Sequence, residues 1–256
     1  MHPTPWKAFC LVAVMFFAPW LAVGAEAGTR GFQSRVYVDA QGTKHPFVVF
    51  IPAKYQPGQN PPVMLFLHGS GERGANNIDQ MMAGIGPALW KRKASFPFVV
   101  VLPQCQVDSN WLVDGADAQR ALAMLRQVQA EFSTDPDRVI LTGLSMGGSG
   151  TWSIAARDPS AWSAIVPMCG RPDVTSAAKL AAARLPVWNF CGDKDRPETV
   201  KANRDMAEAL RQAGASATYT EYPEVGHNCW DKAYGTDELY MWMLEQSRRK
   251  NADKRS

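Results

Sequence analysis

A strong charge of one sign is missing from this 256-residue chain: 27 Lys and Arg residues balance 24 Asp and Glu residues, giving a formal net charge of +3. No basic cluster is interleaved with aromatic residues, as a nucleic-acid-binding face requires, so we predict no nucleic-acid partner. Internal repeats and low-complexity segments are also absent. The hydrophobic fraction of 46%, with 20 Gly and 18 Pro, excludes disordered, collagen-like and coiled-coil chains and favours a globular protein.

A hydrophobic run long enough to cross a membrane is missing as well. The apolar run near the N-terminus is shorter than the roughly 20 residues that a spanning helix needs, and Pro19 interrupts it. Lys7 precedes this run and small residues follow it, which is the pattern of a cleavable secretion signal. We predict a signal peptide over residues 1–25, cleaved after Ala25 or Ala27; an uncleaved anchor is the alternative. The mature protein is then secreted or periplasmic, without stable membrane insertion.

Cysteine is scarce, with 5 residues in the chain. Loss of Cys10 with the signal peptide leaves an even number, which permits two disulfides in an exported protein, whereas buried free thiols are the alternative. No two of these cysteines lie close enough in the sequence to form a zinc knuckle, so we predict no metal site. The four cysteines that are left are Cys105, Cys169, Cys191 and Cys229.

Short β-branched segments alternate with helical patterns along the chain. Strands are expected at 35–38, 47–51, 63–67, 98–102, 139–142, 164–168, 187–190 and 218–222, with a hairpin turn at 41–43. Helices are expected at 118–132, 148–157, 199–213 and 237–250. An antiparallel start followed by strand–helix alternation predicts an α/β fold with a mostly parallel, twisted sheet of about eight strands and helices on both faces. We expect one domain over residues 26–247 and a charged, solvated tail over residues 248–256.

A Gly-x-Ser-x-Gly pattern at residues 143–147 lies between an expected strand and an expected helix, which is the setting of a nucleophile elbow. The turn is so tight that side chains at the flanking positions would collide, which explains both glycines. It presents the hydroxyl of Ser145 above the end of the strand and directs the amide of Met146 at a developing oxyanion. Ser145 is therefore the predicted nucleophile, and Met146 the predicted oxyanion donor.

Histidine is also scarce, which limits the choice of a catalytic base. Of the 4 histidines, His2 lies in the signal peptide and His45 in the early hairpin. His68 ends a strand beside a glycine, where we expect it to shape the loop. His227 lies in the loop between the last strand and the last expected helix, so it is the predicted base. A satisfied surface histidine is the alternative.

An acid must orient this imidazole, and two carboxylates, Asp193 and Asp195, follow the strand at 187–190. With either of them, the order Ser, Asp, His along the chain is that of the α/β-hydrolase triad. From about residue 33 to residue 244 the chain resembles the α/β-hydrolase superfamily, and within it the compact secreted esterases. These include acetylxylan and feruloyl esterases, the polyhydroxybutyrate-depolymerase group, and chains labelled predicted peptidase or phospholipase/carboxylesterase. The resemblance rests on residues 67–74, 102–105, 135–139, 143–148 and 222–227.

The resemblance implies an α/β-hydrolase fold and a serine hydrolase that needs no cofactor. In similar proteins the acid stands three residues after the glycine that ends the strand, which selects Asp195. The second oxyanion donor comes from the loop after His68, with Ser70 as the first choice. We expect Glu72 and Arg73 to pair with each other and fix this loop.

The resemblance has two departures, Cys191 in place of a usual histidine and Cys229 close after the base. Because the acid loop and the base loop must meet, we predict a disulfide between Cys191 and Cys229. Cys169 with Cys191 is the competing pair, and Cys105 is expected to be free.

No cap domain is expected, because residues 169–186 leave room only for a loop and a short helix. An open cleft suits small acyl or aryl groups attached to a bulky or polysaccharide-linked alcohol. Trp111 and Trp230 lie in loops at the catalytic edge, where they either line the substrate or serve in packing. The predicted function is a secreted serine carboxylic-ester hydrolase. A serine peptidase of the prolyl-oligopeptidase kind and a non-catalytic binding module with the same fold are the alternatives.

Overall fold

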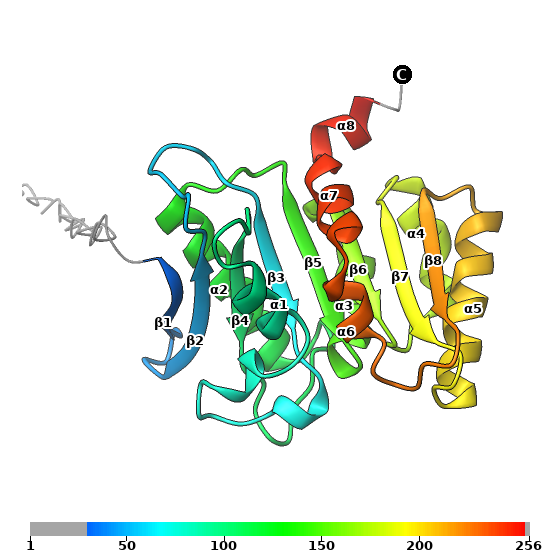
Figure 1. Cartoon of the computed structure of the whole chain (residues 1–256), viewed down its shortest axis with the longest axis horizontal. Helices are drawn as coiled ribbons and strands as arrows, with labels where there is room; N and C mark the ends of the chain where they lie inside the picture. The colour runs from blue at the N-terminus through cyan, green and yellow to red at the C-terminus, as the bar shows by residue number, and fades with distance from the viewer. Residues whose placement is uncertain (1–29, 254–256) are drawn as a thin grey trace, which may run out of the picture.

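The computed structural model describes residues 30–253, so the predicted signal peptide lies outside the described residues. Within this range the chain forms a single sheet of eight strands in the order β1-β2-β4-β3-β5-β6-β7-β8 (Figure 1). The strands are β1 (Gly31–Val38), β2 (Lys44–Ile51), β3 (Val63–Leu67), β4 (Val99–Pro103), β5 (Val139–Leu144), β6 (Ala164–Met168), β7 (Val187–Gly192) and β8 (Ala217–Tyr222). β1 and β2 run antiparallel to their neighbours, and all other neighbouring pairs are parallel.

Helices cover both faces of the sheet, because the central strands are apolar on both sides. In β3, Val63, Leu65 and Leu67 belong to one hydrophobic cluster, while Met64 and Phe66 belong to the other. The first cluster is closed by α2 (Ala116–Phe132), α3 (Met146–Arg157), α4 (Ala177–Ala182) and α5 (Pro197–Gln212). The second is closed by α1 (Ile85–Arg92), α6 (Trp230–Gly235) and α7 (Asp237–Glu245), which lie in front of the sheet in Figure 1. This architecture confirms the predicted fold.

The segment between β6 and β7 is as short as the sequence indicates. It holds a 3-10 turn, η4 (Val174–Ser176), followed by α4. Within the described residues no cap domain is inserted there, so no cap covers the carboxyl edge of the parallel strands. The loops that follow β3, β5, β7 and β8 are among those that lie at this edge.

Two helices were not expected from the sequence. In α1 the helical pattern is weakened by Gly86 and Pro87 in the first turn. α6 is a helix of 6 residues, Trp230–Gly235, and is too short to show a helical period.

The C-terminal segment differs from the prediction in two respects. The expected helix at 237–250 divides into α7, which ends at Glu245, and α8 (Arg248–Asp253). Residues 248–250 are exposed, as expected for a solvated tail, but α8 is also bonded to the domain. The Arg248 amide donates to the carbonyl of Asp137 at 2.8 Å, and the Asn251 side-chain amide donates to the carbonyl of Ser163 at 3.0 Å.

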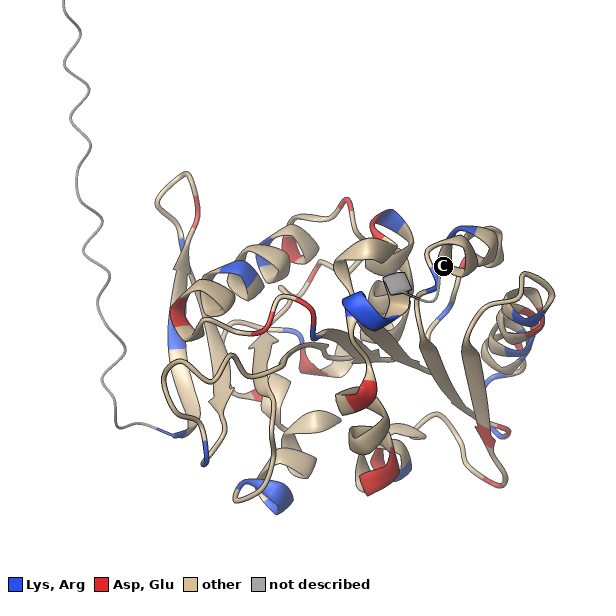
Figure 2. Ribbon diagram, turned by 90° about the horizontal axis from the view of Figure 1, so that it is seen from above, with Lys and Arg blue, Asp and Glu red and all other residues tan. Residues whose placement is uncertain are grey.

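Charges of both signs lie close together on the surface helices (Figure 2). In α5, Lys201 pairs with Asp205 and Arg211 with Glu208. Between residues 30 and 253, none of the helices combines the length and the apolar character needed to span a bilayer.

Candidate active site

Ser145 lies in the sharp turn between β5 and α3, with φ 53° and ψ −112°. The two neighbouring glycines are required by close backbone contacts. A Cβ on Gly147 would lie 1.9 Å from the Leu67 carbonyl oxygen, and one on Gly143 would lie 2.5 Å from the carbonyl oxygen of Gly147. The amide of Ser145 donates to the carbonyl of Met168 at 2.9 Å, which ties the turn to β6. The sequence pattern therefore forms the strained elbow that it indicates.

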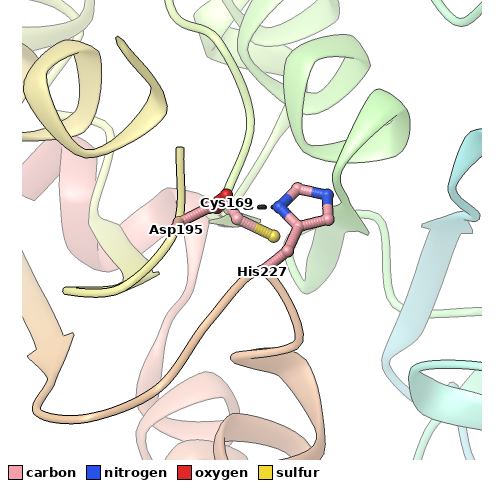
Figure 3. A group of neighbouring side chains, drawn as sticks. All are labelled: Cys169, Asp195 and His227. Carbon is pink, nitrogen blue, oxygen red and sulfur yellow. Dashed lines mark hydrogen bonds and ion pairs between the residues drawn. The ribbon is translucent and has the colours of Figure 1, made fainter. Parts of the chain in front are cut away.

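His227 brings the serine and an acid into one hydrogen-bonded chain. Its Nε2 lies 2.8 Å from Oγ of Ser145, and its Nδ1 lies 2.7 Å from Oδ2 of Asp195. Because a carboxylate only accepts, Nδ1 carries the proton and Nε2 accepts from the serine hydroxyl. The Asp195 side chain is fully buried, whereas the His227 side chain is 35% exposed. Figure 3 shows the carboxylate of Asp195 facing the ring.

The structure also distinguishes the two candidate acids. Oδ1 of Asp195 accepts the amide of Arg196 at 2.7 Å, so both carboxylate oxygens have partners. Asp193 does not contact the histidine, and its amide donates to the carbonyl of Tyr222. The geometry therefore agrees with Asp195, the residue that the resemblance selects.

The loop after β3 approaches the elbow closely. A Cβ on Gly69 would lie 3.6 Å from Cβ of Ser145, so the backbone of this loop borders the nucleophile. Ser70 begins the 3-10 turn η1 (Ser70–Glu72), and Met146 begins α3. The first amides of a helix have no acceptor within the helix, so the amide of Met146 is available to a substrate oxygen. Met146 thus follows Ser145 directly, and Ser70 follows Gly69, whose backbone borders the nucleophile.

His68 fixes this loop, as the sequence suggested. It is fully buried, its Nδ1 donates to the carbonyl of Gly69 at 2.6 Å, and its Nε2 accepts the amide of Cys105 at 2.9 Å. Burial lowers the pKa of His68 to about 4, so the ring is neutral near pH 7. The carbonyl of Gly69 and the amide of Ser70 belong to one peptide plane, and therefore His68 also sets the direction of that amide.

The expected pair between Glu72 and Arg73 is wrong. The guanidinium of Arg73 extends to Met146 instead, where Nη2 lies 3.0 Å from the sulfur. Oε2 of Glu72 turns back toward His68, at 4.0 Å from Nδ1. Burial raises the pKa of the Glu72 carboxyl. The two adjacent side chains diverge, and sequence adjacency alone could not show this.

The two tryptophans have different positions. Trp111 is 1% exposed, and its Nε1 donates to the carbonyl of His68 at 2.9 Å, so its prediction as a substrate-lining residue is wrong and the packing alternative holds. Trp230 is half-buried, with its ring edge-to-face against His227 at a centroid distance of 5.5 Å. It borders the predicted base and stays a candidate lining residue.

The predicted disulfide between Cys191 and Cys229 is wrong, and so is the competing pair. All four cysteines in the described chain are buried free thiols. The prediction that Cys105 is free is therefore confirmed. The thiol of Cys191 donates to the carbonyl of Gly192, while Cys229 faces Cys169 at the end of β6. The acid and base loops do meet, since a Cβ on Gly192 would lie 2.2 Å from the Val225 carbonyl oxygen, but Cys191 and Cys229 stay free.

A cluster of three donor groups was missed by the sequence analysis. One ligand atom from each of Cys169, Asp195 and His227 lies within 4.8 Å of the others (Figure 3). These residues come from three separate segments of the chain, so no spacing rule could reveal them. Only the order of the strands, which places the ends of β6 and β7 side by side, indicates their proximity.

The chain is similar to a known protein family, to characterised relatives and to solved structures. The model of the dienelactone hydrolase family matches residues 31–239. A bifunctional acetylxylan esterase/xylanase of Neocallimastix patriciarum is 31% identical over 162 residues, which cover 62% of this chain and 22% of that protein. The chain thus spans about a fifth of the length of this relative.

Among solved structures, one described as a thermostable esterase has a TM-score of 0.76 and 28% identity, and covers 84% of this chain and 63% of its own. A ferulic acid esterase has a TM-score of 0.67 and 17% identity, covering 83% and 96% of the two chains, and shows the likeness of fold alone.

Proposed function

Because the chain belongs to the dienelactone hydrolase family, we propose that it is a serine hydrolase that cleaves carboxylic esters through an acyl-enzyme at Ser145. The observation that carries the proposal is the continuous chain of hydrogen bonds from Ser145 through His227 to Asp195. A serine hydroxyl is a weak nucleophile at neutral pH, and a base within hydrogen-bond distance is what activates it. The elbow, the base and the buried acid supply the parts that this chemistry needs.

In the first half of the reaction, Nε2 of His227 takes the hydroxyl proton while Oγ of Ser145 attacks the ester carbonyl. The buried carboxylate of Asp195 keeps the other ring proton on Nδ1 and stabilises the imidazolium that forms. The amides of Met146 and Ser70 donate to the oxyanion of the tetrahedral intermediate. As this intermediate collapses, His227 returns the proton to the departing alcohol and the acyl group stays on the serine.

In the second half, water takes the place of the alcohol. His227 accepts a proton from the water as it attacks the acyl carbonyl, and the same two amides stabilise the second oxyanion. Collapse releases the carboxylic acid and restores the serine hydroxyl. Apart from the ester and water, each step uses only residues of this chain.

For the substrate we propose small acyl or aryl esters on a bulky or polysaccharide-linked alcohol. The support is the short connection between β6 and β7, which leaves the carboxyl edge uncovered, and the printed names of the relatives, acetylxylan esterase and ferulic acid esterase. Secretion to the periplasm or the medium is part of this proposal and rests on the N-terminal sequence alone.

A substrate panel on the purified protein tests the proposal. It comprises p-nitrophenyl esters from acetyl to longer acyl chains, acetylated xylan, methyl ferulate and peptide amides. We expect hydrolysis of short esters by the wild type and none by Ser145→Ala, with an organophosphonate labelling only the wild type. Faster cleavage of peptide amides would favour the peptidase alternative. Absence of both hydrolysis and labelling would favour the binding module.

A further inference from the structure

Cys169 is a buried nucleophilic side chain that the proposed mechanism does not use. It follows β6, directly beside the elbow and the acid loop, and its φ of 42° lies in the left-handed region that few residues other than glycine adopt. Its amide donates to the carbonyl of Phe190 in β7 at 2.8 Å, which holds this residue in place. In Figure 3 the sulfur points toward the side chain of His227.

We propose that Cys169, Asp195 and His227 form a site for a thiophilic divalent cation such as Zn²⁺, and that binding there switches the hydrolase off. Sulfur, imidazole nitrogen and carboxylate oxygen are the three ligand types that zinc takes in proteins. Three protein ligands leave the fourth tetrahedral position to water or to a nearby oxygen. The site would be inhibitory rather than a cofactor site, because it uses groups that catalysis needs.

The present distances are close to those that such a site requires. Zinc bonds of about 2.3 Å to sulfur and about 2.0–2.2 Å to nitrogen and oxygen place tetrahedral ligands roughly 3.3–3.6 Å apart. The three ligand atoms now lie within 4.8 Å of one another, and Nδ1 of His227 lies 2.7 Å from Oδ2 of Asp195. The sulfur must therefore move inward and the nitrogen and oxygen must separate, each by an adjustment within the reach of side-chain rotation.

Coordination at Nδ1 is incompatible with base catalysis. In the active arrangement Nδ1 carries the ring proton and Nε2 accepts the proton of Ser145. A metal on Nδ1 takes the lone pair there, so the single proton of the neutral ring moves to Nε2. The Cys169 thiol gives its proton to solvent when it binds the metal, while Asp195 is already a carboxylate. Three metal bonds form, one proton leaves for solvent and one moves from Nδ1 to Nε2, so Nε2 can no longer accept from the serine.

A cation reaches this site past His227, the most exposed of the three ligands, with a side chain that is 35% exposed. Cys169 and the Asp195 side chain lie behind it and are buried. Metal binding competes with the hydrogen bond between His227 and Asp195, so we expect a chelator to reverse the inhibition.

Two measurements test the site. In the first, ester hydrolysis is followed during titration with Zn²⁺, and EDTA is then added. The rate of each variant is compared with the rate of the same variant without metal. We expect inhibition of the wild type, recovery with EDTA, and inhibition weakened by more than about tenfold in Cys169→Ser, since even outer partners of metal ligands contribute about 10–100-fold to affinity. Cys105→Ser is the matched control, because Cys105 is a buried thiol held by Asp117, outside the cluster.

The second measurement does not depend on the proposed hydrolase function. Co²⁺ is added to Ser145→Ala, and the thiolate-to-cobalt absorption band is recorded. We expect the band in this variant and its loss in the double variant with Cys169→Ser. Equal Zn²⁺ inhibition of the wild type and Cys169→Ser, or a cobalt band that survives without Cys169, would overturn the site. If no ester is cleaved at all, the hydrolase proposal fails and the cobalt band alone decides.

Discussion

At the residue scale, two aspartates two positions apart provide a direct test of the triad. Replacement of Asp195 by Asn keeps the shape of the side chain but removes the charge that fixes the His227 proton on Nδ1. We expect kcat to fall by about 10⁴, the loss seen for this change in a serine-protease triad. Steady-state kinetics on a p-nitrophenyl ester measures it, and circular dichroism checks the fold.

Asp193→Asn is the matched control, because this residue lies in the same loop and does not contact the histidine. Its kcat is expected to stay within about threefold of the wild-type value, an effect below about 0.7 kcal/mol on the barrier. A large loss in Asp193→Asn, together with normal activity in Asp195→Asn, would contradict the assignment of the acid.

The residue scale is also where sequence reasoning succeeds and fails for identifiable reasons. Ser145 and His227 could be predicted because local patterns and elimination point to them. Trp111 could not be placed, since whether a loop tryptophan faces solvent or the core depends on a distant residue, here His68. The cysteine pairing failed because bringing two loops together does not fix which side chains face each other.

At the element scale, the predicted strands are confirmed. The central strands combine apolar sequences with burial on both faces, whereas the edge strand β8 is only partly buried. The helices with a long apolar stripe, such as α2, are confirmed because that stripe is buried in a hydrophobic cluster. The short helices α1 and α6 could not be predicted, because a helix of two turns shows too little periodicity and depends on tertiary packing. The docking of α8 escaped prediction because its residues are mostly charged.

The contact of α8 with the domain leads to a stability prediction. The side-chain amide of Asn251 donates to the buried carbonyl of Ser163 at 3.0 Å, and the residue is 8% exposed. Asn251→Ala leaves that carbonyl without this donor, so we expect the free energy of unfolding to fall by about 1–2 kcal/mol. Urea denaturation measures the change.

Lys250→Ala in the same helix is the control, since Lys250 is exposed and its bond to the Glu245 carbonyl is on the surface. A change within about 0.5 kcal/mol is expected there. Equal effects of the two substitutions would mean that the Asn251 bond does not anchor α8.

At the scale of the whole molecule, the pH dependence of stability reports on the packing beneath the catalytic edge. His68 connects the ends of β3 and β4, because its ring bonds the Gly69 carbonyl on one side and the Cys105 amide on the other. Its pKa is about 4 in the folded protein, against an ordinary value of 6.5, with burial as the main cause. Protonation in the folded state would remove the acceptor that Nε2 offers to Cys105.

The sign of the effect follows from these two values. Between about pH 6.5 and pH 4 the unfolded chain binds a proton at His68 that the folded protein does not bind, so the free energy of unfolding decreases as the pH falls. The full difference is about 3 kcal/mol, present above pH 6.5 and lost below pH 4. Glu72 titrates nearby with a raised pKa, which acts in the opposite direction, so the wild-type curve alone does not isolate the histidine.

The comparison with His68→Gln isolates it. Glutamine does not titrate, so the variant is expected to be less stable than the wild type at pH 7, and the gap should narrow by about 3 kcal/mol as the pH falls to 4. Urea denaturation at a series of pH values measures both curves. Parallel curves between pH 7 and pH 4 would show that His68 gains its proton equally in both states, and that burial does not hold this ring neutral.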